Sequence, residues 1–283
     1  MSEQPARKAP AIHQGRVVRT ERITPHMVRI VLGGDGLAGF SADEYTDHYV
    51  KLLFPLPGVR YPEPFDMDRI REEFPRDQWP ANRTYTIRSW DPALREAAID
   101  FVVHGDEGLA GPWAARAQVG EIMYMLGPGG GYSPDPAAGT HLLVGDESAL
   151  PAIAASLERM DRNATGHAFV EVESAEEEQK IDAPAGIELR WLHRAGRPVG
   201  ELLIAAVRDL ELPAGDVHAF VHGEAGFVKD LRRHLRMERE IPRERLSISG
   251  YWRLGQTDEA WRAVKREWNE QVEREQETQA PTA

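Results

Sequence analysis

The segment at residues 127–139, GPGGGYSPDPAAG, constrains the fold most, because its five glycines and three prolines interrupt any regular helix or strand. Before it, the chain consists of short runs rich in β-branched residues. After it, apolar runs of strand length alternate with stretches of helical length. We therefore place a domain boundary here and expect two domains of different architecture among the 283 residues.

Six runs in the first half have the composition of strands, at residues 15–24, 26–34, 48–54, 84–90, 98–104 and 121–126. Residues 55–80 are rich in proline and charge, which indicates an inserted loop with a short helix near residues 68–73. A second short helix is expected within residues 108–117, where Pro112 suits a first helical turn. The pattern predicts a six-stranded antiparallel β-barrel over residues 1–135.

In the second half, strands expected at residues 141–145, 168–172, 187–192, 217–221 and 246–251 alternate with helices at 149–160, 200–210 and 225–239. This alternation predicts an α/β domain with a parallel sheet over residues 140–255. Thr257 has the properties of an N-cap, so residues 256–283 should hold a C-terminal helix that ends near residue 275. Residues 276–283 should form a disordered tail.

The absence of cysteine excludes disulfides, thiolate catalysis and cysteine-ligated zinc or iron–sulfur clusters. The net charge of −12 disfavours a nucleic-acid partner, because binding phosphates needs a basic surface. No run of about 18 apolar residues predicts membrane insertion, and the polar first ten residues carry no apolar signal core. We expect a cytoplasmic monomer.

Residues 83–88, Arg-Thr-Tyr-Thr-Ile-Arg, form the first segment that could carry chemistry. On a strand, Arg83, Tyr85 and Ile87 point one way, while Thr84, Thr86 and Arg88 point the other. Arg83 could hold a pyrophosphate through its fork of donors while Tyr85 lies against an aromatic cofactor. An ordinary edge strand with surface arginines is the alternative.

Two later segments lie where a strand leads into a helix. Within residues 100–114, free N–H groups at the helix start would attract anions. The alternative is a plain strand–turn–helix in which the tryptophan is buried. Residues 143–152 form the first strand-to-helix turn of the α/β domain, where such folds bind nucleotides. This turn lacks GxGxxG. Asp146 and Glu147 would repel pyrophosphate but could accept hydrogen bonds from ribose hydroxyls, or simply complement the helix dipole.

Two more segments lie near the end of the α/β domain. Residues 222–227 could line the same nucleotide-binding crevice as the turn at residues 143–152, or form a plain glycine-bearing loop. Tyr251 and Trp252 stand beside Arg253 and could stack on a flavin or hold an anionic ligand. A core tryptophan with a solvated arginine is the alternative. Trp261 and Trp268 are seven residues apart on the last helix, so both should pack inward.

These five segments, in this order, resemble the siderophore-interacting proteins, a family of FAD-dependent ferric reductases in the ferredoxin-reductase-like superfamily. The resemblance covers about residues 15–268, and its most specific parts are residues 83–88, 145–152 and 250–259. It implies FAD as cofactor, NADH or NADPH as electron donor, and a ferric siderophore as substrate.

The resemblance also implies the site residues. The implied contacts of FAD and the nicotinamide nucleotide are Arg83, Tyr85, Thr86, Asp100, Val102, His104, Ala110, Gly111, Trp113, Ala114, Asp146, Glu147, Ser148, Ala149 and Trp252. A basic substrate pocket over the flavin would use Lys51, Arg253 and Lys265. No catalytic proton-transfer residue is implied, and no protein metal site, because the iron belongs to the substrate.

In the implied mechanism, NAD(P)H passes a hydride to the flavin, which then passes single electrons to Fe(III), and the Fe(II) formed is held more weakly by hard oxygen donors. Two alternatives stay open: a general NAD(P)H:flavin or ferredoxin-linked oxidoreductase, and a siderophore-binding protein without reductase activity. The donor also stays open, because Arg190, Arg194 and Arg197 could meet a 2′-phosphate or be solvated.

Overall fold

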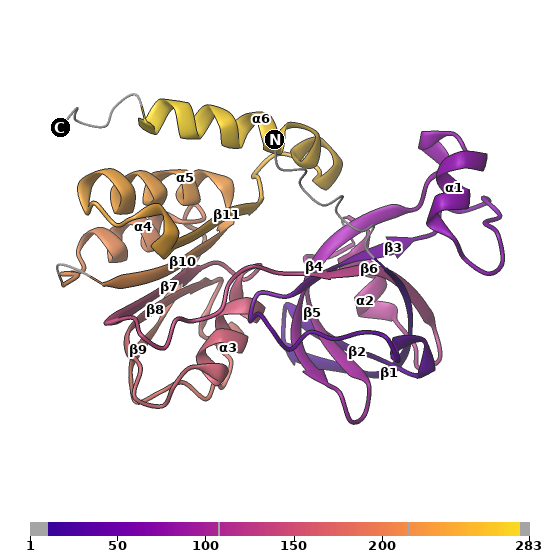
Figure 1. The fold of residues 1–283 in the computed structure, drawn as a ribbon, viewed down its shortest axis with the longest axis horizontal. Helices are drawn as coiled ribbons and strands as arrows, with labels where there is room; N and C mark the ends of the chain where they lie inside the picture. Colours follow the sequence, from indigo (N-terminus) through magenta and orange to yellow (C-terminus); the bar gives the residue numbers. More distant parts are fainter. Residues whose placement is uncertain (1–10, 107, 214–215, 278–283) are drawn as a thin grey trace, which may run out of the picture.

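A computed structural model describes residues 11–106, 108–213 and 216–277. Figure 1 shows a β-barrel beside an α/β domain, with the C-terminal helix lying across the α/β domain. The barrel closes in the order β1-β2-β5-β4-β3-β6, and the second sheet has the order β11-β10-β7-β8-β9. The predicted fold class is confirmed.

The barrel consists of antiparallel strands whose inward side chains fill its centre. The strands are β1 (Ile12–Thr24), β2 (Met27–Gly33), β3 (Tyr49–Phe54), β4 (Ala81–Asp91), β5 (Glu96–Val102) and β6 (Ile122–Gly129). The insertion after β3 carries α1 (Met67–Glu73), as predicted, and α2 (Ala110–Arg116) packs onto the barrel core. Strand β6 runs to Gly129, and so reaches into the glycine-rich segment that we took as the boundary.

The α/β domain has a five-stranded parallel sheet covered on both faces. Its strands are β7 (Thr140–Gly145), β8 (Thr165–Val172), β9 (Gly186–His193), β10 (Val217–Glu224) and β11 (Leu246–Trp252). Helix α3 (Leu150–Arg159) lies on the face towards the barrel, while α4 (Glu201–Arg208) and α5 (Ala225–Arg233) cover the other face. The strand order reverses between β7 and β10, which is the position where open α/β sheets bind ligands at the carboxyl ends of their strands.

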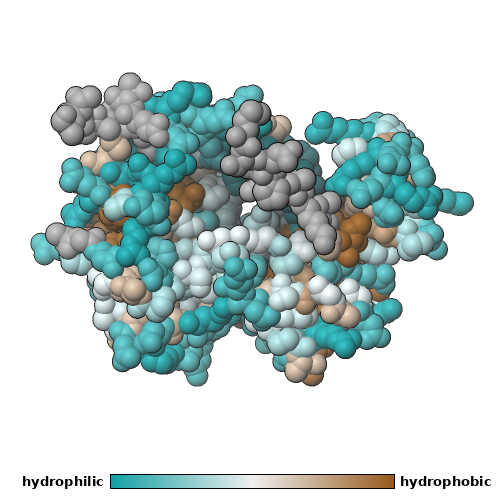
Figure 2. All heavy atoms as spheres, viewed as in Figure 1, coloured by the Kyte–Doolittle hydropathy of each residue, from teal (hydrophilic) through white to brown (hydrophobic). Residues whose placement is uncertain are grey.

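Short helical turns complete the described elements, at Asp35–Leu37, Arg76–Gln78, Ala175–Glu177 and Arg243–Arg245, with a π-helical turn at His234–Glu238. The π turn continues α5, so the helix predicted at residues 225–239 is present but is not α-helical throughout. Among the described residues, no helix is both long enough and apolar enough to cross a membrane. Figure 2 shows a largely hydrophilic surface on the face seen in Figure 1.

The last helix, α6 (Asp258–Glu277), is exposed along most of its length, and its buried apolar residues are Trp261 and Val272 among those whose side chains the structure describes. Its N-cap is Thr257, whose Oγ1 accepts a hydrogen bond from the Ala260 N–H at 3.2 Å, as predicted. Trp261 is buried and its ring contacts that of the half-buried Trp268 at 5.2 Å. The helix continues through residues 276 and 277, which we had placed in the tail; residues 278–283 of that tail lie outside the described residues.

Polar contacts join the two domains. Arg88 on β4 donates to both carboxylate oxygens of Glu158 on α3, at 2.5 and 2.7 Å. The Thr24 hydroxyl donates to Glu177 at 2.5 Å, and Glu177 is 5% exposed. A bidentate arginine–carboxylate pair constrains orientation as well as distance, so these contacts fix how the carboxyl edge of the sheet faces the barrel.

Candidate functional site

Strand β4 presents its two faces to different surroundings. Tyr85 lies with its ring 4.3 Å from that of Phe101, and Ile87 is buried in the barrel core. On the opposite face, Thr86 is buried and hydrogen-bonds with the Tyr251 phenol of the α/β domain. Burial raises the pKa of both tyrosines, so both phenols stay protonated. The predicted alternation along this strand is confirmed.

Arg83 lies on the same strand, between the barrel and α6. Its Nη1 is 2.6 Å from Glu259 Oε1 and 3.5 Å from Asp258 Oδ2, and it also donates to the Asn82 carbonyl at 2.9 Å. The Arg83 side chain is 16% exposed, whereas that of Glu259 is 54% exposed. A guanidinium whose closest partner is a solvated carboxylate can exchange that partner for another anion.

Four of the residues predicted on β5 and α2, Asp100, Ala110, Trp113 and Ala114, have side chains that contact other protein groups, and their predicted contacts with FAD stay a prediction. The Asp100 carboxylate accepts from Arg29 Nε at 2.6 Å and Nη2 at 2.8 Å, and Asp100 is 3% exposed, so its charge is already satisfied inside the protein. The Trp113 ring packs against Phe101 at 5.5 Å. Ala110 and Ala114 are also buried in the barrel core. The side chains of Asp100, Ala110 and Ala114 are buried, whereas Trp113 is half-buried.

His104, part of Trp113 and the backbone remain accessible in this segment. Among the described residues, which omit residue 107, no side chain caps the start of α2 at Leu109, so the first N–H groups of the helix remain donors. A Cβ on Gly111 would lie 3.0 Å from the Val102 carbonyl oxygen, so glycine permits the close packing of α2 on β5. Val102 is half-buried, and His104 is exposed, with its ring 6.0 Å from that of His26.

At the carboxyl end of β7, Asp146 joins three loops. Its Oδ1 accepts from the Ser148 N–H and hydroxyl at 2.9 and 2.5 Å, and its Oδ2 accepts from the Glu224 N–H and from Trp252 Nε1, both at 2.8 Å. Asp146 and Ala149 are fully buried. Burial raises the pKa of Asp146 despite these donors. These contacts assemble the edge of the sheet; Ser148 and Trp252 are half-buried, and the predicted contacts of these four residues with a nucleotide stay a prediction.

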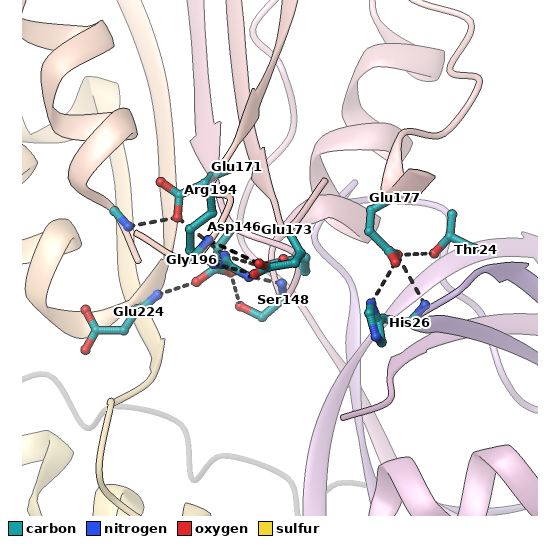
Figure 3. A network of polar contacts seen from close by, with 12 residues as sticks. Thr24, His26, Asp146, Ser148, Glu171, Glu173, Glu177, Arg194, Gly196 and Glu224 are labelled. Atoms are coloured by element: carbon teal, nitrogen blue, oxygen red, sulfur yellow. Dashed lines mark hydrogen bonds and ion pairs between the residues drawn. The ribbon is translucent and has the colours of Figure 1, made fainter. Parts of the chain in front are cut away.

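Arg194, directly after β9, binds three glutamates at the same edge, and Figure 3 labels two of them, Glu171 and Glu173. Its Nη2 lies 2.8 Å from Glu147 and 2.9 Å from Glu173, and its Nη1 lies 3.5 Å from Glu171. Burial alone would lower the pKa of Arg194, but the hydrogen bonds that it donates to Glu147 and Glu173, and their negative charge, raise it overall. Burial raises the pKa of Glu171, which also accepts from the Gly200 N–H at 2.9 Å.

The sequence analysis missed Glu171, Glu173 and Glu177. Their signal was present, because Glu171 lies near the end of the predicted strand at residues 168–172 and Glu173 directly follows it, at the edge where the ligands of such sheets bind. Of the three arginines left open, Arg194 is buried, whereas Arg190 and Arg197 are exposed. Arg190 lies over the Phe169 ring at 5.3 Å.

The three cations predicted for the substrate pocket come from two regions. Arg253 and Lys265 belong to the β11–α6 segment: Arg253 lies 5.9 Å from the Trp261 ring, and Lys265 Nζ donates to Ser249 Oγ at 3.2 Å. Burial lowers the pKa of Lys265. Lys51 is exposed on β3, paired in register with Thr84 of β4, one residue from Arg83.

Known proteins share this architecture over nearly the whole chain. Two family models match, "Siderophore-interacting FAD-binding domain" over residues 16–132 and "Siderophore-interacting protein" over residues 138–255. An uncharacterized protein of Mycobacterium tuberculosis is 46% identical over 270 residues, covering 90% of this chain and 95% of its own length.

Two named relatives are more distant. The ferric vibriobactin reductase ViuB of Vibrio cholerae is 35% identical over 251 residues, covering 86% of this chain and 90% of its own. The NADPH-dependent ferric-chelate reductase of Escherichia coli is 33% identical over 242 residues, covering 83% of this chain and 91% of its own.

Solved structures agree with these matches. The siderophore-interacting protein SipS from Aeromonas hydrophila superposes with a TM-score of 0.79 at 31% identity, covering 92% of this chain and 99% of its own. A ferredoxin reductase of carbazole 1,9a-dioxygenase shares the fold alone, at 15% identity and a TM-score of 0.62, covering 86% of this chain and 68% of its own. The chain belongs to the siderophore-interacting protein family, as its sequence motifs predicted.

Proposed function

We propose that the protein is an FAD-dependent ferric-siderophore reductase that takes electrons from NADH or NADPH. The observation that carries this proposal is the placement of Arg83 and Tyr85 on one face of β4, inside the region that matches an FAD-binding domain. The family match and the two relatives named as ferric reductases support it.

The residues around β4 and α2 fit a flavin dinucleotide. Arg83 and the uncapped N–H groups of α2 provide positive charge and donors for a pyrophosphate. The Tyr85 ring provides an aromatic surface that stays uncharged. Gly105 and Gly108 have φ values of 59° and 81°, which let the connecting loop turn tightly between β5 and α2.

FAD, when bound, would supply hydride acceptance and one-electron transfer to ferric iron. The protein's part is to bind and orient it. Arg83 would hold the pyrophosphate, Tyr85 would lie along the ring system, and Thr86 would present its hydroxyl at the ring edge while Tyr251 fixes its direction. No side chain needs to move a proton for electron transfer to iron, so we propose no catalytic acid or base.

For the substrate, we propose an anionic ferric siderophore held by Lys51, Arg253 and Lys265. Three cations at one site would attract anions that the rest of a surface with a net charge of −12 repels. We also propose the domain division at residues 1–135, 140–255 and 256–283, and a monomer in the cytoplasm. A ferredoxin is the alternative electron donor. These parts of the proposal rest on sequence reasoning and on the family.

The test begins with the absorbance spectrum of the purified protein, where we expect a bound flavin. The reduced protein is then mixed anaerobically with a ferric siderophore, and the flavin should reoxidise at a rate that saturates with siderophore concentration. A general flavin reductase would show no saturable preference. A colourless protein that refuses added FAD would contradict the proposal and favour a siderophore-binding protein.

A further inference from the structure

We propose that the carboxyl edge of β7, β8 and β9 binds the adenosine end of the electron-donating dinucleotide and selects NADH over NADPH, with Glu173 as the residue that discriminates. This inference deepens the proposed function and rests on it for the identity of the donor. It assigns a ligand to the carboxylate cluster around Arg194, which the proposed function does not use.

The topology places Glu173 where a ribose is read. In open α/β sheets the ligand binds beyond the carboxyl ends of the strands, beside the point where the strand order reverses. Here that point lies next to β7, and β8 is the strand that follows it in the chain. Glu173 comes directly after β8, which ends at Val172. An acidic residue in this part of a dinucleotide-binding unit accepts hydrogen bonds from the ribose 2′-hydroxyl.

The charges at this edge are unfavourable for a 2′-phosphate. A 2′-phosphate is best bound by an arginine with free donors, and the arginine present, Arg194, is 8% exposed and already paired with Glu147, Glu171 and Glu173. Three carboxylates therefore surround one guanidinium (Figure 3). A dianionic phosphate brought to this cluster would meet net negative charge and no uncommitted donor of Arg194.

Glu173 retains the capacity to accept from a hydroxyl. Its side chain is 44% exposed, more than that of Glu147 at 12% or Glu171 at 0%. Oε2 accepts from Arg194, whereas Oε1 accepts only the Gly196 N–H, at 3.3 Å, among the described residues. A carboxylate oxygen accepts more than one hydrogen bond, so a ribose diol can donate to Oε1 without displacing Arg194.

Two basic residues near this edge, His193 and Arg197, do not offset the negative charge of the carboxylates around Arg194. His193 Nε2 is 2.7 Å from Glu178, which ties it to another carboxylate. Arg197 is exposed on the β9–α4 loop, where solvent and salt screen its charge. It is nevertheless the cation that a 2′-phosphate would use if the inference were wrong, and it therefore serves in the test.

Equilibrium binding of ADP-ribose and 2′-phospho-ADP-ribose, measured by calorimetry, tests the inference without requiring turnover. We expect ADP-ribose to bind the wild-type protein about ten-fold more tightly, because like charges oppose the extra phosphate. Glu173→Gln keeps an acceptor for Arg194 but removes the charge, and should reduce the preference to about three-fold or less. Glu188→Gln, which removes an exposed glutamate on β9 away from this edge, and Arg197→Ala should both leave the preference unchanged.

Equal or tighter binding of the 2′-phosphorylated ligand would overturn the inference, as would a wild-type preference that Glu173→Gln leaves intact. Binding of neither nucleotide would also overturn it. These results are separate from the proposed function. A protein that holds FAD and is reoxidised by a ferric siderophore but ignores both nucleotides refutes only the donor site. A protein that prefers ADP-ribose but holds no flavin refutes only the reductase.

Discussion

Two arginines, one in each domain, show how the surroundings decide what a guanidinium can bind. Arg83 on the barrel has a side chain that is 16% exposed, and its closest partner, Glu259, is 54% exposed. Arg194 in the α/β domain is 9% exposed by side chain, and its partners Glu147 and Glu171 are 12% and 0% exposed. Both residues were considered for phosphate binding from the sequence.

The two arginines differ in the free energy that it costs to replace their carboxylate partners with a phosphate. A solvated carboxylate such as Glu259 regains water when it releases Arg83, so a phosphate can take its place at little cost. The carboxylate of Glu171 has no water to regain and would remain as an uncompensated buried charge. Arg83 is therefore available for a cofactor, whereas Arg194 is a structural cation, and the two can be separated by mutation.

The largest effect is expected at Arg194. Arg194→Ala strands Glu171 and should lower the free energy of unfolding by about 3–5 kcal/mol, measured by urea denaturation followed by circular dichroism. The matched control is Arg162→Ala, which removes an exposed pair with Asp182 in the same domain and should cost less than about 1 kcal/mol. Equal effects of the two variants would show that the cluster is not closed to solvent.

Arg83→Ala should affect binding rather than folding. Loss of a charge-assisted contact to pyrophosphate should weaken FAD binding by about 1.5–3 kcal/mol, or roughly 10- to 150-fold, in a fluorescence titration of the apoprotein. Arg95→Ala, which breaks an exposed pair with Asp35 on the barrel, is the control and should leave FAD affinity unchanged. Unchanged flavin retention in Arg83→Ala would show that Arg83 is misassigned.

A third prediction concerns the burial of His222, near the carboxyl end of β10. His222 is 4% exposed, and burial lowers its pKa to about 3. The unfolded chain binds a proton near pH 6.5, so the stability from neutral His222 is fully present above pH 6.5 and is lost as pH falls. The expected loss is about 1.4 kcal/mol per pH unit at most.

His222→Gln should remove this part of the slope when urea midpoints are compared between pH 7 and pH 5. If the two proteins lose stability equally over that range, His222 takes up a proton in the folded state and the end of β10 is open to water. His104 of the barrel is the comparison for the buried His222, because its side chain is exposed in the folded protein.

The smallest expected effect is the change in FAD affinity in Glu259→Gln, and the sign of this change is informative. Glu259→Gln removes the carboxylate that competes for Arg83 and should tighten FAD binding by about 0.2–1 kcal/mol, the range of an exposed ion pair. The measurement is the same fluorescence titration, compared at low and high salt. Weaker FAD binding in this variant would mean that Glu259 supports the cofactor site instead of occupying it.

The architecture could be predicted because local periodicity carries it. Alternation along residues 83–88 correctly separated Tyr85 from Thr86, and the change of pattern after residue 127 separated barrel from parallel sheet. The roles of Asp100, Asp146 and Arg194 could not be predicted in the same way. The donors to Asp146 include the Glu224 N–H and the Trp252 indole, 78 and 106 residues away in the chain. Only the folded sheet brings these groups to one carboxylate.

The central claim is that an FAD on the barrel passes electrons to a ferric siderophore. It is tested most directly by anaerobic stopped-flow mixing of the reduced holoprotein with a ferric siderophore, following the return of oxidised flavin absorbance. The account predicts reoxidation whose rate saturates with siderophore and falls in Lys265→Ala. A purified protein without flavin, or a reduced flavin indifferent to the ferric complex, would contradict it.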